Sequence, residues 1–241
     1  MRTIGILGGM SWESTAIYYE HLNHSVRQAR GGLHSAPVII DSVNFAQMAV
    51  WQRAGDWHSA GEFLAQKAQC LQAAGCQAIA IATNTMHKVY DAIQSQIDIP
   101  VIHIADAVCD EASQRGISRV LFLGTQFSMT DDFLRERYAQ RNIDWQIPNA
   151  DDRDLVHAMI FERLCQGEVR DADKAALLAI IERCVEDSVV RGVAAPQAVV
   201  LGCTELVLLL SEDAPCVLPI LDSTRIHAQA LAAFVLTKGT H

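Results

Sequence analysis

The chain has 241 residues, of which 50% are hydrophobic and 20% are charged, as expected for a folded protein with a substantial core. Its formal net charge of -9 disfavours a nucleic acid or an anionic membrane as a partner, because both attract basic surfaces. Its 7 cysteines are scattered without a C-x-x-C pair, which favours neither a disulfide framework nor a metal site.

The opening stretch, MRTIGILGGMSW, is too short in apolar residues for a signal-peptide core, and we interpret it as a first strand. No apolar run approaches the roughly 18 residues that span a bilayer. We therefore expect no membrane segment and a cytoplasmic protein.

Short apolar runs alternate with longer amphipathic segments, which is typical of parallel strands joined by helices. The first part is expected to contain, in chain order, a strand over 3–9, a helix over 11–30 that Ser11 caps, a strand over 37–45, a helix over 61–75 and a strand over 77–83. The rest is expected to contain a strand over 100–106, a helix that ends at Gly116, a strand over 119–125, helices over 130–141, 151–165 and 172–191, strands over 197–205 and 216–222, and a helix over 223–236. The predicted fold class is α/β.

Similar short stretches recur in the same order in the two halves of the chain. The stretch GILGGMS returns as LFLGTQFS, and IAIATNT returns as AVVLGCTE, which puts Thr83 and Cys203 in corresponding places. Four such correspondences occur in the same order, between 116 and 120 residues apart, and this indicates two halves of similar topology. The other two pairs are Pro100 with Pro219 and Asp106 with Asp222.

We therefore predict two Rossmann-like parallel-sheet domains related by a pseudo-twofold axis. Residues 1–103 and 216–241 are assigned to the first domain, and residues 104–215 to the second. Ligands of open parallel sheets bind beyond the carboxyl ends of the strands. We expect an active site between the domains, where Thr83 and Cys203 approach one ligand from opposite sides.

Cys203 follows a predicted strand and precedes a helix that is expected to start near Thr204. A helix start favours the thiolate, so we expect the pKa of this thiol to fall towards neutrality and the thiolate to act as a base. The alternative is a buried structural cysteine, and the polar neighbours Thr204 and Glu205 do not decide between the two.

The TNT stretch that starts at Thr83 offers hydroxyls, an amide and backbone N–H groups, which together can hold a carboxylate. Its alternative is a simple helix cap, since Thr and Asn are common caps. We interpret His87 as a packing residue. Gly8 and Gly9 do not form a G-x-G-x-x-G dinucleotide motif, and a tight turn explains them.

A pyridoxal phosphate enzyme needs a lysine that forms a Schiff base with the cofactor. None of the four lysines lies at the end of a predicted strand, which makes this cofactor improbable. They are Lys67, Lys88, Lys174 and Lys238.

Five stretches together resemble the aspartate/glutamate racemase family over nearly the whole chain and in the right order: GGMSWEST, TNTMH, LGTQFSMT, LGCTEL and ILDSTRIHA. The resemblance implies two α/β domains with a pseudo-twofold relation, an active site between them, no cofactor, and often a homodimer. It also implies that two cysteines on opposite faces of the amino acid exchange its α-proton.

Carried over by position, the resemblance makes Cys203 the cysteine of the second domain, whereas the cysteine of the first domain falls on Thr83. The family's substrate-binding or pocket-lining positions fall on a larger set of residues. Asn84, Thr85, Thr204 and Glu205 match positions that hold the α-carboxylate and amino group or line the pocket, Met10 and Gln52 match pocket positions of the first domain, and Thr125 and Thr130 match the place of the side-chain carboxylate.

The threonine at position 83 changes the chemistry, because a hydroxyl is a far weaker acid than a thiol and cannot rest as an anionic base near neutral pH. We predict that Cys203 removes the proton from one enantiomer and that Thr83 returns a proton on the other face. The resemblance implies that the cysteine of the second domain faces the L-substrate, so L-aspartate or L-glutamate is expected to be the better substrate. Two alternatives stay open: a single-cysteine decarboxylase or isomerase of small diacids, and a non-catalytic binding protein for an acidic amino acid.

Overall fold

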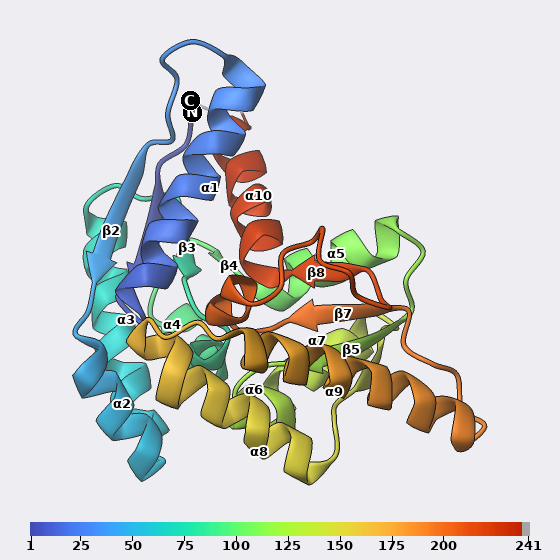
Figure 1. The fold of residues 1–241 in the computed structure, drawn as a ribbon. Coiled ribbons are helices and arrows are strands. Elements are labelled where there is room, and N and C mark those ends of the chain that lie inside the picture. Colours follow the sequence, from blue (N-terminus) through green and yellow to red (C-terminus); the bar gives the residue numbers. More distant parts are fainter. Residues whose placement is uncertain (238–241) are drawn as a thin grey trace. The chain divides into compact units, whose positions relative to one another are not determined.

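The computed structural model describes residues 1–237, and the chain divides into two compact units (Figure 1). Unit 1 comprises Met1–Ile104 and the segment that begins at Thr224, and unit 2 comprises Ala105–Ser223. Residues 238–241, which include Lys238 and end the expected first domain, lie outside the described part of the chain. No helix within residues 1–237 combines the length and the apolar character that crossing a bilayer requires.

Unit 1 contains a parallel sheet of four strands in the order β2-β1-β3-β4. Its strands are β1 (Ile4–Gly8), β2 (Val38–Ser42), β3 (Ala78–Ile81) and β4 (Val101–Ile102). Its helices are α1 (Trp12–Arg30), α2 (Phe45–Ala54), α3 (Trp57–Ala73), α4 (Tyr90–Gln94) and α10 (Ser223–Leu236), and a short 3-10 helix, η1 (Thr85–Val89), precedes α4.

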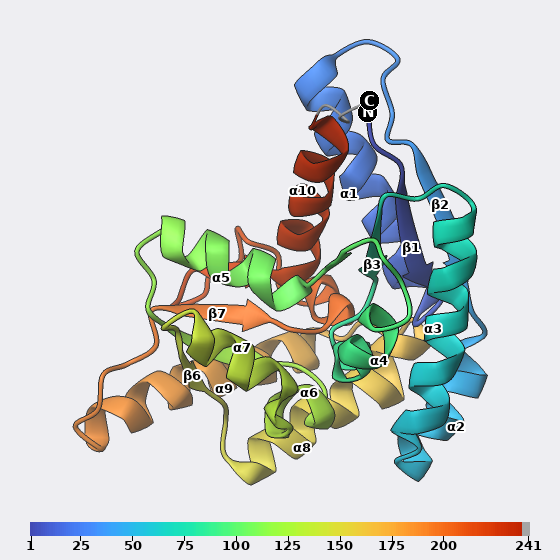
Figure 2. The same cartoon turned by 180° about the vertical axis from the view of Figure 1, so that it is seen from behind.

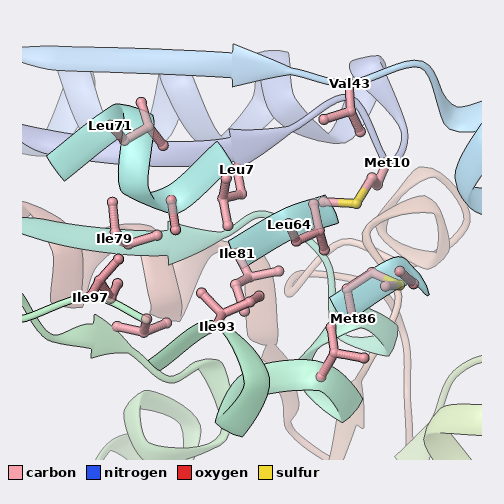
Figure 3. Packing of buried hydrophobic residues seen from close by; sticks show 14 of the residues in the cluster. Leu7, Met10, Val43, Leu64, Leu71, Ile79, Ile81, Met86, Ile93 and Ile97 are labelled. Carbon is pink, nitrogen blue, oxygen red and sulfur yellow. The ribbon is translucent and has the colours of Figure 1, made fainter. Parts of the chain in front are cut away.

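Alternate residues of these strands pack into two apolar clusters, one on each face of the sheet. Ile4 and Ile6 pack with α1 and α10, which lie side by side (Figure 1 and Figure 2). Leu7, Ile79 and Ile81 pack on the other face with α3 and α4, as Figure 3 shows. Both faces of the sheet are therefore covered, which explains why its strands are continuous apolar runs.

Unit 2 contains a second parallel sheet of four strands in the order β6-β5-β7-β8. Its strands are β5 (Arg119–Leu123), β6 (Asp144–Gln146), β7 (Ala198–Leu201) and β8 (Ile220–Asp222). Its helices are α5 (Ile104–Gln114), α6 (Gln126–Thr130), α7 (Asp132–Gln140), α8 (Ala150–Ala158) and α9 (Asp171–Val190), with the shorter π-helix η2 (Met159–Arg163) and the 3-10 helices η3 (Leu164–Gln166) and η4 (Thr204–Leu208).

The two sheets repeat the same strand order, which confirms two α/β halves of similar topology. Ile79 pairs with Val101 in unit 1, and Val199 pairs with Ile220 in unit 2. This register makes β3 equivalent to β7 and puts Thr83 and Cys203 at the same position beyond their strands. It also shows that the expected match of Asp106 with Asp222 is wrong, because the residue at the equivalent position to Asp222 is His103.

The boundary between the units differs from the one expected. Unit 2 continues to Ser223 and does not end at residue 215. The physical reason is that β8 pairs with β7, so the segment before α10 completes the second sheet.

Several local elements also differ from expectation. The strand expected over 37–45 ends at Ser42, because Asn44 caps the unpredicted α2 with a bond from the Ala46 N–H to its Oδ1 of 3.1 Å. The strand expected over 100–106 shortens to β4, since α5 begins at Ile104. The short strand β6 and the short helix α6 were not predicted, and the helix expected over 130–141 corresponds to α7.

Candidate active site

In unit 1 the candidate site is the region beyond the carboxyl ends of β1 and β3. Leu7 pairs with Ile81, so the turn after β1 and the TNT stretch leave the sheet next to each other. The turn requires glycine at position 9, where φ is +84° and a Cβ would lie 2.2 Å from the Val43 carbonyl oxygen. The Gly9 N–H donates to Thr15 Oγ1 at 2.8 Å and closes the turn.

The TNT stretch is largely enclosed. Asn84 and Thr85 are buried, whereas Thr83 is partly exposed. Asn84 occupies the cap position of η1 but makes no side-chain capping bond to this helix, so Asn84 does not act as a simple side-chain cap.

The two other predicted residues of unit 1 lie within its core. Met10 belongs to the apolar cluster of Figure 3, where it lies near Val43. Gln52, on α2, is also buried, and its Nε2 donates to Met86 Sδ at 3.0 Å. Gln52 thus contacts Met86, the residue that follows Thr85 along η1.

In unit 2, Thr125 and Thr130 stand at opposite ends of the short helix α6. Thr125 is buried and caps this helix, with its Oγ1 accepting the Ser128 N–H at 3.2 Å. Thr130 is exposed, and its hydroxyl donates to the Gln126 carbonyl at 2.8 Å. Thr125 therefore lies directly beyond the end of β5, and Thr130 lies one helix away from it.

Cys203 lies beyond the neighbouring strand β7 and forms a hydrogen-bonded group with the two residues that follow it. Its Sγ donates to Glu205 Oε2 at 2.9 Å, and the Thr204 hydroxyl donates to the same oxygen at 2.8 Å. Thr204 and Glu205 are buried, whereas Cys203 is partly exposed. A single carboxylate oxygen thus holds both the thiol and the hydroxyl in place.

A glycine allows this arrangement. A Cβ on Gly202 would lie 1.9 Å from Cζ of Phe122, whose ring is fully buried and stacks on Trp145 at a centroid distance of 4.2 Å. The aromatic ring therefore occupies the space beside the backbone that leads to Cys203.

Part of the Cys203 residue reaches the solvent, but its sulfur is enclosed. Burial of the sulfur is the main reason that the pKa of this thiol lies well above its ordinary value, and the charge of Glu205 raises that pKa further. The expectation of a lowered pKa is therefore wrong. The segment after Cys203 is the five-residue 3-10 helix η4, and its short dipole does not offset the burial of the sulfur. Cys203 rests as a neutral thiol that donates to Glu205.

Sequence reasoning did not identify Cys165 as a neighbour of Cys203. Cys165 lies on η3, which packs against η4, and its charge also raises the pKa of Cys203. No local pattern could reveal this proximity, because it depends on the change from an α-helix to a π-helix and then a 3-10 helix between Ala158 and Gln166.

The chain was compared with protein families and with solved structures. The Asp/Glu/Hydantoin racemase family model matches residues 7–231. A candidate Asp/Glu racemase from Yersinia pestis is 37% identical, with a TM-score of 0.87 over 98% of this chain and 100% of that one. An aspartate racemase homologue from Pyrococcus horikoshii is 30% identical, with a TM-score of 0.80 over 98% of this chain and 99% of that one.

More distant structures share the fold. Aspartate racemase from Picrophilus torridus is 20% identical, with a TM-score of 0.75 over 98% of this chain and 94% of that one. Glutamate racemase from Francisella tularensis, solved with D-glutamate, is 16% identical, with a TM-score of 0.64 over 99% of this chain and 84% of that one. Together with the match over residues 7–231, these findings show that the chain belongs to the Asp/Glu/hydantoin racemase family, whose amino-acid racemases are isomerases.

Proposed function

We propose that the protein is a cofactor-independent racemase of acidic amino acids, in which Cys203 and Thr83 act on opposite faces of the α-carbon. The observation that carries this proposal is their equivalence. Each follows the third strand of its sheet at the same distance, and each stands beside a turn that leaves the first strand. The family membership supplies the reaction class.

The bond between Cys203 and Glu205 provides a route for one proton. For an L-substrate, the thiol proton passes to Glu205 Oε2, and the resulting thiolate removes the α-proton. The thiol is then restored, the carbanion carries the electron pair, and Glu205 holds the proton that Cys203 released. Moving one proton within this pair avoids a second negative charge in the buried group.

Thr83 handles the proton on the other face. Its hydroxyl donates a proton to the carbanion and recovers one from water. Glu205 then gives its proton to the hydroxide that remains, so that Cys203, Glu205 and Thr83 all end the reaction unchanged. In the reverse direction it must pass the α-proton of a D-substrate to water, which is harder for a hydroxyl than for a thiol. We therefore expect L-substrates to react faster. The equilibrium ratio of free enantiomers is still one, so the bias lies only in rates and affinities.

Other predicted residues bind the substrate in this proposal. Polar groups at the strand ends stabilise the negative charge that develops on the α-carboxylate. Asn84, Thr85, Thr204 and Glu205 hold the α-carboxylate and amino group, Thr125 and Thr130 hold the side-chain carboxylate, and Met10 and Gln52 shape the pocket.

The proposal is tested by incubating the enzyme with L-aspartate or L-glutamate in deuterated water and following the α-proton signal by NMR. We expect exchange that Cys203→Ser abolishes. Cys70→Ser is the matched control, because Cys70 is an exposed cysteine of α3 and should exchange like the unmodified protein. Exchange that persists in Cys203→Ser contradicts the role of Cys203, and binding without exchange supports the binding protein.

One observation favours a second candidate. Cys203 is a neutral thiol at rest and Thr83 is no resting base, so the pair is suited to giving a proton to a carbanion formed by loss of carbon dioxide. This would be a decarboxylase of small diacids. Carbon dioxide release from a substituted malonate, lost in Cys203→Ser, would support it.

The proposal includes a homodimer, as the family resemblance implies, and the cytoplasmic location expected from the sequence. Light scattering of the purified protein measures the mass directly. A mass twice that of the 26.4 kDa chain is expected, and a monomer at all concentrations contradicts this part of the proposal.

A further inference from the structure

His87 connects the backbone of Thr83 to the start of α5. The residue lies on η1 and is 2% exposed. Its Nδ1 is 2.8 Å from the Thr83 carbonyl oxygen, and its Nε2 is 3.2 Å from the Ile104 nitrogen. Both ring nitrogens thus contact backbone groups, and they join the end of β3 to the segment after β4.

The two contacts determine which nitrogen carries the proton. The Ile104 N–H can only donate, so Nε2 must accept, and the ring proton therefore stays on Nδ1. Nδ1 then donates to the Thr83 carbonyl, which can only accept. One neutral tautomer satisfies both contacts, whereas a proton on Nε2 would remove the acceptor for Ile104 and set two donors against each other.

A second buried histidine, His227, contacts the end of β4. His227 Nε2 is 2.9 Å from the Ile102 carbonyl oxygen, and its Nδ1 is 2.8 Å from the Tyr18 hydroxyl. The carbonyl requires a proton on Nε2, so the Tyr18 hydroxyl donates to Nδ1. The last residue of β4 is thereby bonded to His227 of α10, whose ring is bonded to Tyr18 of α1, and the His87 ring contacts the chain two residues later, at Ile104.

The position of Ile104 in the chain is a further reason to regard its contact with His87 as specific. Ile104 is the last residue of unit 1, and the chain enters unit 2 at Ala105. The carbonyl of Thr83 is therefore tied through one ring to the point where the chain leaves its unit. A residue that only fills space would not need hydrogen bonds from both ring nitrogens to the backbone. The contact of the His87 ring with the His103 ring, at a centroid distance of 4.4 Å, would be sufficient for packing.

We propose that His87 is a positioning residue for the reaction: its ring holds the Thr83 carbonyl relative to Ile104 and so aims the Thr83 hydroxyl at the α-carbon. This inference rests on the proposed racemase function and on the role of Thr83 in it. His87 acts through Thr83 and touches no reacting atom. It predicts an effect on the face that Thr83 serves and a smaller one on the face that Cys203 serves.

Two substitutions separate the contacts. In His87→Asn the amide nitrogen replaces Nδ1 and can still donate to the Thr83 carbonyl, whereas in His87→Gln the amide oxygen replaces Nε2 and can still accept from Ile104. The readout is the ratio of the α-deuterium exchange rate of D-glutamate to that of L-glutamate. Exchange of the L-form depends on Cys203, so a general loss of folded enzyme lowers both rates equally and leaves their ratio unchanged. His103→Gln is the matched control, since His103 is a buried histidine whose ring packs against that of His87.

We expect His87→Gln to lower the D-to-L exchange ratio roughly 10- to 100-fold, as a small misplacement of a reacting group does. The D-to-L exchange ratio of His87→Asn should stay within about fivefold of that of the unmodified enzyme, because this variant loses the hydrogen bond to Ile104 and keeps the one to Thr83. His103→Gln should leave the ratio unchanged. Equal ratios in His87→Gln and His87→Asn, or a ratio that follows the loss of stability, overturn the positioning role.

The variant Thr83→Ala shows whether a negative result overturns only the role of His87 or also the proposed role of Thr83. If Thr83→Ala lowers the ratio and His87→Gln does not, the inference alone is overturned. If Thr83→Ala leaves the ratio unchanged, the role of Thr83 is overturned and the inference with it. Nitrogen-15 NMR of the histidines provides a check without any variant: a slowly exchanging proton on Nδ1 of His87 supports the inference, and a proton on Nε2 overturns it.

Discussion

Acid should destabilise unit 1 through His227, which must become charged in a fully buried position. The residue is 0% exposed, and burial lowers the pKa of its ring to about 4. In the unfolded chain a histidine has a pKa of about 6.5. Between these values the unfolded chain binds the proton more readily, so the contribution of His227 is present above about pH 6.5 and is lost as the pH falls towards 4.

The size of the effect follows from the two pKa values. A difference of about 2.5 pKa units corresponds to about 3 kcal/mol of unfolding free energy, of which about 2 kcal/mol is lost by about pH 5. The assay is urea unfolding at a series of pH values for the unmodified protein and for His227→Gln. Glutamine keeps a donor for the Ile102 carbonyl but does not titrate, so its unfolding free energy should fall less steeply with acid.

His24→Gln is the control for this comparison, because the side chain of His24 is 67% exposed. Its pH dependence should match that of the unmodified protein. If His227→Gln and the unmodified protein lose stability in parallel between about pH 7 and about pH 5, the reasoning about the buried ring is refuted.

Three further predictions concern Thr83, Cys203 and their neighbours. Gly202→Ala should lower the unfolding free energy by about 1–3 kcal/mol in thermal or urea unfolding, because its Cβ would lie 1.9 Å from Phe122. Glu205→Gln should speed alkylation of Cys203 by iodoacetamide several-fold near neutral pH, because the carboxylate charge raises the pKa of that thiol; an unchanged rate would count against the pair. Thr83→Cys should raise turnover of the D-substrate in a coupled or chiral assay, and D-turnover that stays the same would argue against Thr83 as the proton-handling group.

Much of the fold was predictable because it repeats. The recurring sequence stretches that pair Thr83 with Cys203 correspond to two sheets of the same strand order. The start of α1 was also predictable, since Ser11 caps it with a bond from the Ser14 N–H. In contrast, α2 and β6 were missed. A three-residue edge strand such as β6 carries too few residues for an alternating pattern, and α2 is better marked by Asn44 and the left-handed Gly55 at its ends than by its apolar residues.

The candidate site was predictable in position but not in electrostatics. Strand ends could be recognised locally, which located Thr83 and Cys203. The state of the thiol depends on contacts made in the folded chain, namely the bond to Glu205 and the approach of Cys165, which is far from Cys203 in the sequence. The role we infer for His87 likewise depends on the distance between its Nε2 and the Ile104 nitrogen, which no sequence pattern encodes.

The most direct test of the central claim follows pure L-glutamate or L-aspartate in deuterated water with the unmodified enzyme and measures the configuration and the isotope of the product together. Proton exchange at the α-carbon by Cys203 and Thr83 predicts that a D-enantiomer accumulates, that it carries deuterium at the α-carbon, and that the enantiomer ratio approaches one. A D-enantiomer that retains its original α-proton, or no D-enantiomer from either substrate, would contradict the account.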